Sequence, residues 1–299
     1  MFRKLERSFR ERPIRPGRPG RAKPLALAGP AALWLALVAA SARAEVGHLL
    51  AVETGMLPVI LSAPHGGDLP LPDVVLRRGI GVADFAAARD AGTGEIAERV
   101  AFHLERKLGA RPFLIVARFH RKYLDVNRPR DGAYESAAAG RYYDEYHGAL
   151  ARMVRTVGQS WGRGVLLDIH GQAAEKRTIF RGTLDGKTVR GLLERFGRAA
   201  LSGPASIFGH LETLGYRVSP PGGSPALERR YRGGFIVQTY GSHRRDGIDA
   251  FQLELGSALR IRSVLERTAT DLAEAIAAFA KEFLPLAGLR EEIRPFAQP

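Results

Sequence analysis

Short apolar runs alternate with amphipathic stretches through most of the chain. Six runs, each bounded by glycine, proline or polar residues, lie at 57–63, 112–117, 164–171, 178–183, 234–240 and 248–255. Apolar runs of this length, bounded in this way, are typical of buried strands. The run at 164–171 is apolar on both faces over its first half, which indicates a parallel strand in the interior of a sheet.

The stretches between these runs have helical periodicity. In the segment that opens at Asp90, Ile96, Val100 and Leu104 recur on one face, and Gly109 closes it. Further helices are predicted at 142–157, 189–198, 205–214 and 260–283. Strands that alternate with helices predict an α/β fold, with one mostly parallel sheet covered by helices on both faces.

The first 44 residues are typical of a secretory signal. Residues 1–23 are rich in Arg and Lys, residues 24–40 are almost wholly apolar, and Ala42-Arg43-Ala44 forms a small-x-small cleavage site. Pro30 interrupts the apolar core, which is short for a membrane span, although an uncleaved anchor stays an alternative. We therefore expect cleavage after Ala44, export to the periplasm or medium, a single domain at 45–299, and no stable membrane association after cleavage.

Charge and cysteine content exclude several classes of function. The formal net charge is +14, but the signal segment carries 10 Lys and Arg against 2 Asp and Glu, so most of the excess lies there. We therefore expect no nucleic-acid partner, because the remaining domain is only modestly basic. The chain has no cysteine, which excludes a disulfide framework and thiol catalysis.

Three of the predicted strands end in side chains that can carry chemistry. His65 follows the run at 57–63, His170 ends the run at 164–171 with Asp168 on the same face, and Glu254 lies within the run at 248–255. A carboxylate inside an apolar strand needs a cation, a metal or a proton. Two histidines and a carboxylate are the usual ligands of a catalytic zinc, and a second carboxylate can then act as general base.

These residues belong to an ordered set of motifs that resembles the N-formylglutamate amidohydrolases, a family related to the zinc carboxypeptidases. The resemblance covers roughly residues 58–260. It rests on the motifs Ser62-Ala63-Pro64-His65-Gly66-Gly67, Asp90-x-x-Thr93, Arg121-x-x-x-Asp125-x-Asn127-Arg128, Leu167-Asp168-Ile169-His170-Gly171, Arg181-Gly182-Thr183 and Gln252-Leu253-Glu254. It implies a mixed sheet flanked by helices, with a zinc site at the strand ends.

The resemblance implies one Zn²⁺ per chain, with His65 and His170 as its imidazole ligands. The third ligand has two candidates. Carboxypeptidases have a Glu three residues after the first His, a position held here by Asp68, whereas N-formylglutamate amidohydrolases have an Asp at the start of the next helix, which matches Asp90. We favour Asp90 because its helix opening resembles that of the family, although Asp90 is also well placed as a helix N-cap.

The resemblance also assigns the remaining roles. Glu254 resembles the general base that activates the zinc water, and Asn127-Arg128 resembles the pair that binds the α-carboxylate of the substrate. Arg121, in the same segment, is a further candidate for substrate binding. Asp125 has a structural alternative, as a loop brace paired with Arg121 or Arg128. Four other histidines in polar surroundings are predicted to lie at the surface: His120, His147, His210 and His243.

These assignments predict a zinc-dependent amidohydrolase that cleaves the amide bond of an N-acyl amino acid or small peptide with a free carboxylate. The export signal leaves the substrate open, since N-formylglutamate is an intermediate of cytoplasmic histidine breakdown in the family. An exported amidase or carboxypeptidase acting on peptidoglycan peptides, with the same zinc chemistry, is one alternative. A protein that binds carboxylates without turnover is the other, but it would not need a base opposite a metal.

Overall fold

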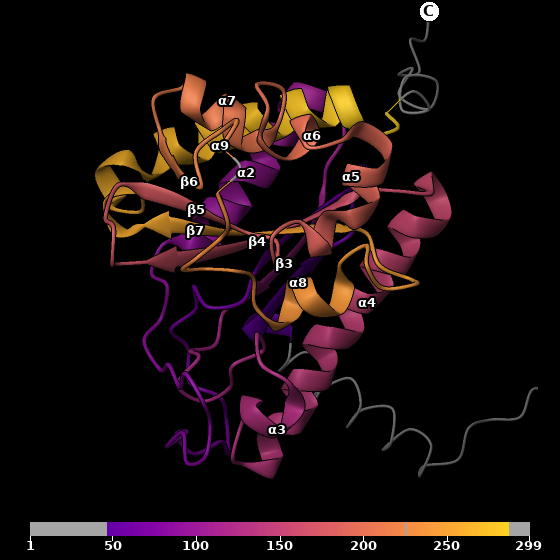
Figure 1. Cartoon of the computed structure of the whole chain (residues 1–299). Helices are drawn as coiled ribbons and strands as arrows, with labels where there is room; N and C mark the ends of the chain where they lie inside the picture. The colour runs from indigo at the N-terminus through magenta and orange to yellow at the C-terminus, as the bar shows by residue number, and fades with distance from the viewer. Residues whose placement is uncertain (1–46, 225, 287–299) are drawn as a thin grey trace, which may run out of the picture. The chain divides into compact units, whose positions relative to one another are not determined.

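The structure is a computed structural model that describes residues 47–224 and 226–286. A seven-stranded sheet in the order β1-β3-β2-β4-β7-β5-β6 organises this part of the chain (Figure 1). The strands are β1 (Leu50–Glu53), β2 (Val59–Ala63), β3 (Phe113–Ala117), β4 (Val165–Gln172), β5 (Thr178–Gly182), β6 (Arg217–Ser219) and β7 (Asp249–Gly256). Strands β3, β2, β4 and β7 are parallel, while β1 and β5 join the sheet antiparallel to β3 and β7. The predicted single mixed, mostly parallel sheet is confirmed.

Helices cover both faces of the sheet, as predicted. Buried residues of α2 (Thr93–Leu108), α7 (Ile207–Thr213) and α9 (Arg262–Phe283) pack on one face, and those of α4 (Gly140–Trp161) and α8 (Phe235–Tyr240) pack on the other (Figure 1). Shorter helices are α3 (Arg130–Ala133), α5 (Arg190–Phe196) and α6 (Ala199–Ser202), with single 3₁₀ turns at Ala137–Ala139, Lys187–Val189 and Ser257–Leu259. Because β4 and β7 are buried on both sides, their sequences read as nearly continuous apolar runs.

The prediction of a strand at 234–240 is wrong, because this run forms α8. A short apolar run cannot be distinguished from one or two turns of buried helix by its periodicity. The sheet also has no place for another strand beside β7, whose two edges are occupied by β4 and β5. Ile236 and Val237 are instead buried against the sheet from the helix.

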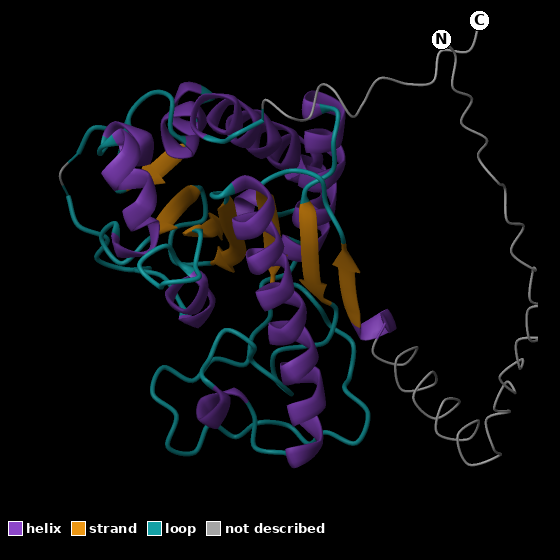
Figure 2. Cartoon of the chain, turned by 90° about the vertical axis from the view of Figure 1, so that its right-hand side faces the viewer, coloured by secondary structure: helices purple, strands orange, loops and turns teal. Residues whose placement is uncertain are grey.

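Two long loops lie at the carboxyl ends of the parallel strands. The loop after β2 and the loop after β3 exchange backbone hydrogen bonds, from Leu69 N to Arg118 O and from Arg77 N to Lys122 O, and Figure 2 shows them beside α4. Gly66 allows the first loop to approach α2, since a Cβ atom at this position would lie 2.5 Å from Gly94 N. The topology thus brings together side chains from β2, β4, β7 and both loops.

The predicted signal at 1–44 lies outside the described residues. Among the residues that the structure does describe, none of the helices has the length and apolar character needed to cross a membrane.

Candidate metal centre and active site

Three buried side chains converge at the carboxyl ends of β2 and β4. His65 follows β2, His170 belongs to β4, and Asp90 precedes α2. Nδ1 of His65 lies 3.1 Å from Nδ1 of His170, and Oδ2 of Asp90 lies 3.5 Å and 3.3 Å from these two nitrogens. The ligand atoms of all three residues lie within 4.8 Å of one another, close enough to bind one metal ion.

The second nitrogen of each imidazole faces a buried carboxylate. Nε2 of His65 lies 2.7 Å from Asp125 Oδ1, and Nε2 of His170 lies 2.8 Å from Asp168 Oδ2. An ionised carboxylate only accepts hydrogen bonds, so each Nε2 donates its proton to its carboxylate. The carboxylates therefore favour tautomers in which both Nδ1 atoms direct lone pairs at the same point, as histidine ligands of a metal do.

The electrostatics of this cluster favour a positive charge between the two rings. Burial lowers the pKa of His170, but the charge and hydrogen bond of Asp168 and the facing carboxylate of Asp90 raise that pKa well above its usual value. Burial raises the pKa of Asp90, but the facing imidazoles of His170 and His65 outweigh it and hold that pKa well below its usual value. Two imidazoles and a carboxylate that meet away from water require a cation, and this donor set fits zinc.

Asp168 is held in place by a hydrogen-bonded chain that involves β2 and α4. Its Oδ1 accepts a 2.6 Å hydrogen bond from the Ser62 hydroxyl, which in turn lies 2.8 Å from the hydroxyl of Tyr146 on α4. Ser62 and Asp168 are register partners in the β2–β4 pairing and lie on the same face as His170. This chain of buried polar groups holds His170 in a single orientation.

Asp125 is surrounded by basic side chains. Its Oδ2 accepts a 2.5 Å hydrogen bond from Arg121, and Arg77 and Arg128 each have a nitrogen 3.8 Å away. Burial raises the pKa of Asp125, but His65 and Arg121 lower it well below its usual value. The predicted brace between Asp125 and Arg121 is confirmed, and the same carboxylate also orients His65.

Glu254 lies beside His170 in the register of β4 and β7. Its side chain is buried, and burial raises the pKa of Glu254, an effect that the charge of His170 opposes in part. Nε2 of Gln252 donates a 2.8 Å hydrogen bond to Oε1 of Glu254. The structure thus contains a second carboxylate next to the metal-ligand cluster.

A cavity of about 540 Å³ opens over this cluster. Its lining includes every residue of the predicted site other than the alternative ligand Asp68, that is His65, Asp90, Arg121, Asn127, Arg128, His170 and Glu254. The buried Asn127 has its Nδ2 3.1 Å from His170 Nε2, and its Oδ1 accepts a hydrogen bond from Ile236 N. Arg128 is less confined, because its guanidinium donates to the carbonyl oxygen of Asp84 and its side chain is 30% exposed.

The structure separates the two candidates for the third ligand. The side chain of Asp68 is 63% exposed and forms an ion pair with Arg89, so it does not join the cluster of His65 and His170. Asp90, by contrast, also accepts a hydrogen bond from Gly171 N, immediately after His170. In this arrangement Asp90 is the carboxylate close enough to share a metal with both histidines.

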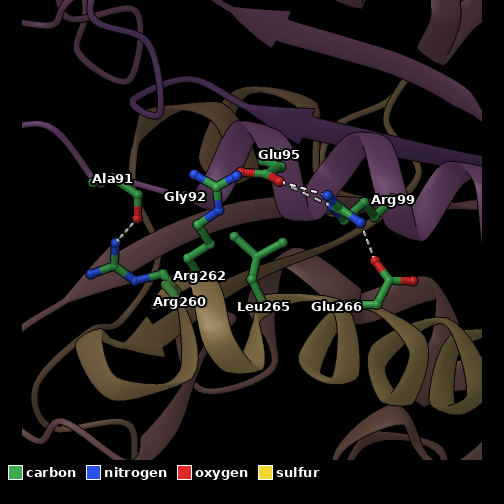
Figure 3. A pocket seen from close by; sticks show the side chains of 8 residues that line it. All are labelled: Ala91, Gly92, Glu95, Arg99, Arg260, Arg262, Leu265 and Glu266. Atoms are coloured by element: carbon green, nitrogen blue, oxygen red, sulfur yellow. Dashed lines mark hydrogen bonds and ion pairs between the residues drawn. The ribbon is translucent and has the colours of Figure 1, made fainter.

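The structural alternative for Asp90, a helix N-cap, is wrong. The N-cap of α2 is Gly92, and no side chain caps it. The turn that holds Asp90 is instead supported by Arg260, whose guanidinium donates to Ala91 O (Figure 3). The same guanidinium also donates to Leu255 O. Figure 3 also shows a groove between α2 and α9 next to this turn, lined by ion-paired surface residues such as Arg99 and Glu266.

The sequence analysis missed several residues of the cavity and its surroundings. Arg77 is buried and donates to the carbonyl oxygens of Arg121 and Gly132, so it ties the two long loops together. Arg230 and Tyr231 line the cavity. Motif spacing gave no signal for these three residues, since they lie in loops without a regular pattern.

The prediction that His147 lies at the surface is also wrong. Nε2 of His147 donates to Val126 O at 2.9 Å, Nδ1 lies 3.0 Å from the Tyr240 hydroxyl, and the ring packs against Tyr143 and Phe235. Burial lowers the pKa of His147 to about 4. This neutral histidine supports the segment that carries Asn127.

Comparisons with known proteins agree with the predicted resemblance. The sequence model of the N-formylglutamate amidohydrolase family matches residues 133–260. The N-formylglutamate deformylase of Pseudomonas putida is 27% identical over 242 residues, which cover 70% of this chain and 84% of that protein. The crystal structure of N-formylglutamate amidohydrolase from Ralstonia eutropha JMP134 has a TM-score of 0.53 and 21% sequence identity, and the match covers 78% of this chain and 97% of that one.

The resemblance to the N-formylglutamate amidohydrolases is therefore confirmed, and these relatives indicate an enzyme that hydrolyses carbon–nitrogen amide bonds. At 21% identity, the Ralstonia structure shows the shared fold alone. The matched segment contains His170 and Glu254 but begins after His65, Asp90 and Asn127-Arg128. For those residues the geometry of the cavity, rather than the family match, supports a common site.

Proposed function

We propose that this chain, which resembles the N-formylglutamate amidohydrolases in sequence and fold, hydrolyses the amide bond of an N-acyl amino acid or small peptide with a free carboxylate, with one zinc ion as cofactor. The observation that carries the proposal is the convergence of His65 Nδ1, His170 Nδ1 and Asp90 Oδ2 beside the buried Glu254, at one cavity. A ligand triad next to a separate carboxylate is the arrangement that metal-assisted amide hydrolysis requires.

His65, Asp90 and His170 would hold the zinc ion. Their atoms are two nitrogens and one oxygen, as in many catalytic zinc sites, which keep a further position open for water or substrate. When bound, zinc supplies a Lewis acid that polarises the scissile carbonyl and makes water more acidic. Asp125 and Asp168 keep both imidazoles in the tautomer that offers Nδ1 to the metal.

Glu254 is the proposed general base. Its carboxylate is buried beside His170 and lines the cavity, so it can take a proton from the attacking water and pass that proton to the leaving nitrogen. The raised pKa of Glu254 that follows from burial makes it a better proton acceptor than an exposed carboxylate. Gln252 holds one of its oxygens.

Arg128 is the proposed partner of the substrate carboxylate. It lines the cavity with a side chain that is 30% exposed, and one of its terminal nitrogens is held by Asp84 O while its Nε faces Asp125. A planar guanidinium with a terminal nitrogen left for the substrate can bind a carboxylate with high geometric selectivity. The Nδ2 of Asn127 can contribute a second donor from the cavity lining, whereas Arg121 is only 11% exposed and is already bound to Asp125.

The signal at 1–44 leads us to propose that the enzyme acts outside the cytoplasm. An exported enzyme would meet scavenged N-acyl amino acids or peptides of the cell wall rather than an intermediate of cytoplasmic breakdown. Peptidoglycan peptides therefore stay the main alternative substrate, with the same catalytic groups. A protein that only binds carboxylates is a weaker candidate, because binding alone gives no reason to bury Glu254 beside a metal site.

The test is Glu254→Gln, assayed against N-formyl-L-glutamate, other N-acyl amino acids and short peptidoglycan peptides. The substitution keeps the shape of the side chain but removes the base, so kcat should fall by about a hundredfold or more with zinc content unchanged. Glu266→Gln on the exposed face of α9 is the control and should keep full activity. Wild-type turnover by Glu254→Gln would show that the proposed mechanism is wrong.

A further inference from the structure

Two carboxamide side chains at the cavity share an unusual arrangement around the start of α8. Oε1 of Gln252 accepts a 2.5 Å hydrogen bond from Gly234 N, and Oδ1 of Asn127 accepts a 2.8 Å hydrogen bond from Ile236 N. Gly234 is the N-cap residue of α8. The first backbone N–H groups of a helix have no partner within the helix, so these two side-chain oxygens satisfy groups that would otherwise be orphaned.

These contacts determine which way each carboxamide faces. A backbone N–H can only donate, so it must meet the amide oxygen, and the amide nitrogen must then lie on the opposite side. For Gln252 this directs Nε2 at Oε1 of Glu254, 2.8 Å away. A flipped amide would place two donors together at Gly234 and two acceptors together at Glu254, and both contacts would be lost.

The start of α8 can approach this closely only because residue 234 is glycine. A Cβ atom at this position would lie 2.3 Å from Asn127 Nδ2 and 2.8 Å from Asn127 Cγ. Gln238, one turn into α8, supports the same turn from the other side by donating to Gly233 O at 2.8 Å. The segment before α8 is therefore held by several polar contacts, of which the one through Gln252 leads to Glu254.

We propose that Gln252 is a positioning residue for Glu254, fixed in its orientation by the N-terminus of α8. This inference rests on the proposed function, in which Glu254 is the base. Gln252 lies two residues before Glu254 on the same face of β7, and both side chains are buried. With one oxygen held by Gln252, the carboxylate of Glu254 keeps its other oxygen for the attacking water.

The experiment compares Gln252→Met, Glu254→Gln and the double variant, with Gln238→Met as the matched control. Met has a similar length but no donor or acceptor at its end. In Gln252→Met, kcat should fall by about tenfold or more, as is typical when a group that orients an active-site residue is removed. KM should stay within about twofold and the zinc content should be close to that of the wild type, because the hydrogen bonds of Gln252 go to Gly234 and Glu254 and not to the metal ligands or Arg128. The thermal midpoint should fall modestly, because Gly234 N loses its acceptor.

Two further readouts separate positioning from general damage. Gln238→Met disturbs the same turn without touching Glu254, so it should keep kcat within about twofold. In the Glu254→Gln background, Gln252→Met should cause no further loss, since there is no base left to orient. Gln252→Asn, which keeps the amide but shortens the side chain by one methylene, covers the case in which the Met variant does not fold, and it should show the same selective fall in kcat.

The outcomes distinguish this inference from the proposed function. If Glu254→Gln is inactive but folded Gln252→Met or Gln252→Asn keeps the kcat of the wild type, the positioning role is wrong and the proposed function stands. A loss from Gln252→Met that multiplies with that of Glu254→Gln also contradicts positioning. If Glu254→Gln itself is fully active, the proposed function fails, and this inference fails with it.

Discussion

Nδ1 of His65 lies 3.1 Å from Nδ1 of His170, with both rings held from behind by carboxylates. Two ring nitrogens that each direct a lone pair at the other repel, unless a cation lies between them. Asp90 adds a third electron-rich atom at 3.3 Å and 3.5 Å. The hydrogen bonds that His65 donates to Asp125 and His170 donates to Asp168 therefore maintain an arrangement of the two rings that a metal ion would stabilise.

The first prediction concerns this third ligand. Asp90→Ala should lose most of the zinc found in the purified wild-type protein, because the carboxylate closest to both histidines is removed. Asp68→Ala is the matched control and should retain about one equivalent, because Asp68 is largely exposed and paired with Arg89. Metal analysis by inductively coupled plasma mass spectrometry measures both.

The same measurement can contradict the assignment. Zinc loss by Asp68→Ala with retention by Asp90→Ala would move the site to the spacing of the carboxypeptidases. His170→Ala provides a positive control, since loss of one of the two imidazoles should remove the metal whichever acid completes the site.

A second prediction concerns Asp125. Asp125→Ala removes the carboxylate shared by His65 and Arg121, so it leaves buried cationic groups without compensation. Removing one partner of a buried ion pair typically costs about 3–5 kcal/mol of folding free energy. Asp144→Ala is the control, because Asp144 forms an exposed ion pair with Arg130 that should contribute at most about 1 kcal/mol. Urea unfolding measures both changes, and an equally small effect of the two substitutions would contradict this role.

The alternation of strands and helices was predictable because a parallel sheet covered on both faces leaves nearly continuous apolar runs in the sequence. Strand β4 and helix α9 carry that signal clearly. It failed at α8, where a short buried helix has the same apolar composition as a strand. It also missed β1 and β6, since three- and four-residue strands at a sheet edge bury too few side chains to produce a pattern.

The site shows a similar division. His65, His170 and Glu254 could be found because polar residues at the ends of apolar strands are conspicuous, and the motif order added Asp90 and Asn127-Arg128. Contacts that depend on the path of a loop could not be found. Arg77 supports the site by donating hydrogen bonds to backbone carbonyl oxygens. The orientation of the Gln252 carboxamide depends on the start of α8, a segment that the sequence predicted as a strand. Burial of His147 likewise depends on tertiary packing that the local sequence does not reveal.

A third prediction is a pH dependence that originates at His147. Its pKa is about 4 in the folded protein, where burial disfavours the charged ring, against about 6.5 in the unfolded chain. The folded pKa is the lower one, so the unfolded chain takes up the proton first as the pH falls. The contribution of neutral, buried His147 to the free energy of unfolding is therefore fully present above about pH 6.5 and is lost as the pH falls toward 4. The difference of roughly 2.5 pKa units corresponds to about 3 kcal/mol.

Urea unfolding between pH 7.5 and 4 tests this effect. The free energy of unfolding of the wild type should fall more steeply over this range than that of His147→Gln, which cannot be protonated there. The variant should be the less stable of the two at pH 7.5, because it perturbs the contacts with Val126 O and Tyr240. Parallel curves for the two proteins would contradict the assignment of this pH dependence to His147.

A fourth prediction concerns export. The mature protein should begin at Glu45, because the small-x-small site ends at Ala44. Mass spectrometry of the amino terminus, after expression of the full chain and fractionation of the cells, tests this. A soluble cytoplasmic protein that keeps residues 1–44 would remove the argument against N-formylglutamate as the natural substrate.

The last prediction separates the two arginines that the sequence proposed for substrate binding. Arg128→Met should raise KM by about 10- to 100-fold for substrates with a free carboxylate, since a hydrogen bond to a charged group contributes roughly 1.5–3 kcal/mol. Preference for these substrates over their carboxamide analogues should disappear, while kcat changes little. Arg121→Met should act on stability instead, because the side chain of Arg121 is only 11% exposed and is bound to Asp125.

Steady-state kinetics on matched pairs of N-acyl amino acids and their amides, together with thermal unfolding, measure both variants. The contrast should be a change in KM without a loss of stability for Arg128, and a loss of stability for Arg121. If Arg128→Met kept its preference for carboxylates, Arg128 would not be the residue that binds the substrate. Arg230 would then be the next candidate, because it lines the same cavity and its side chain is exposed.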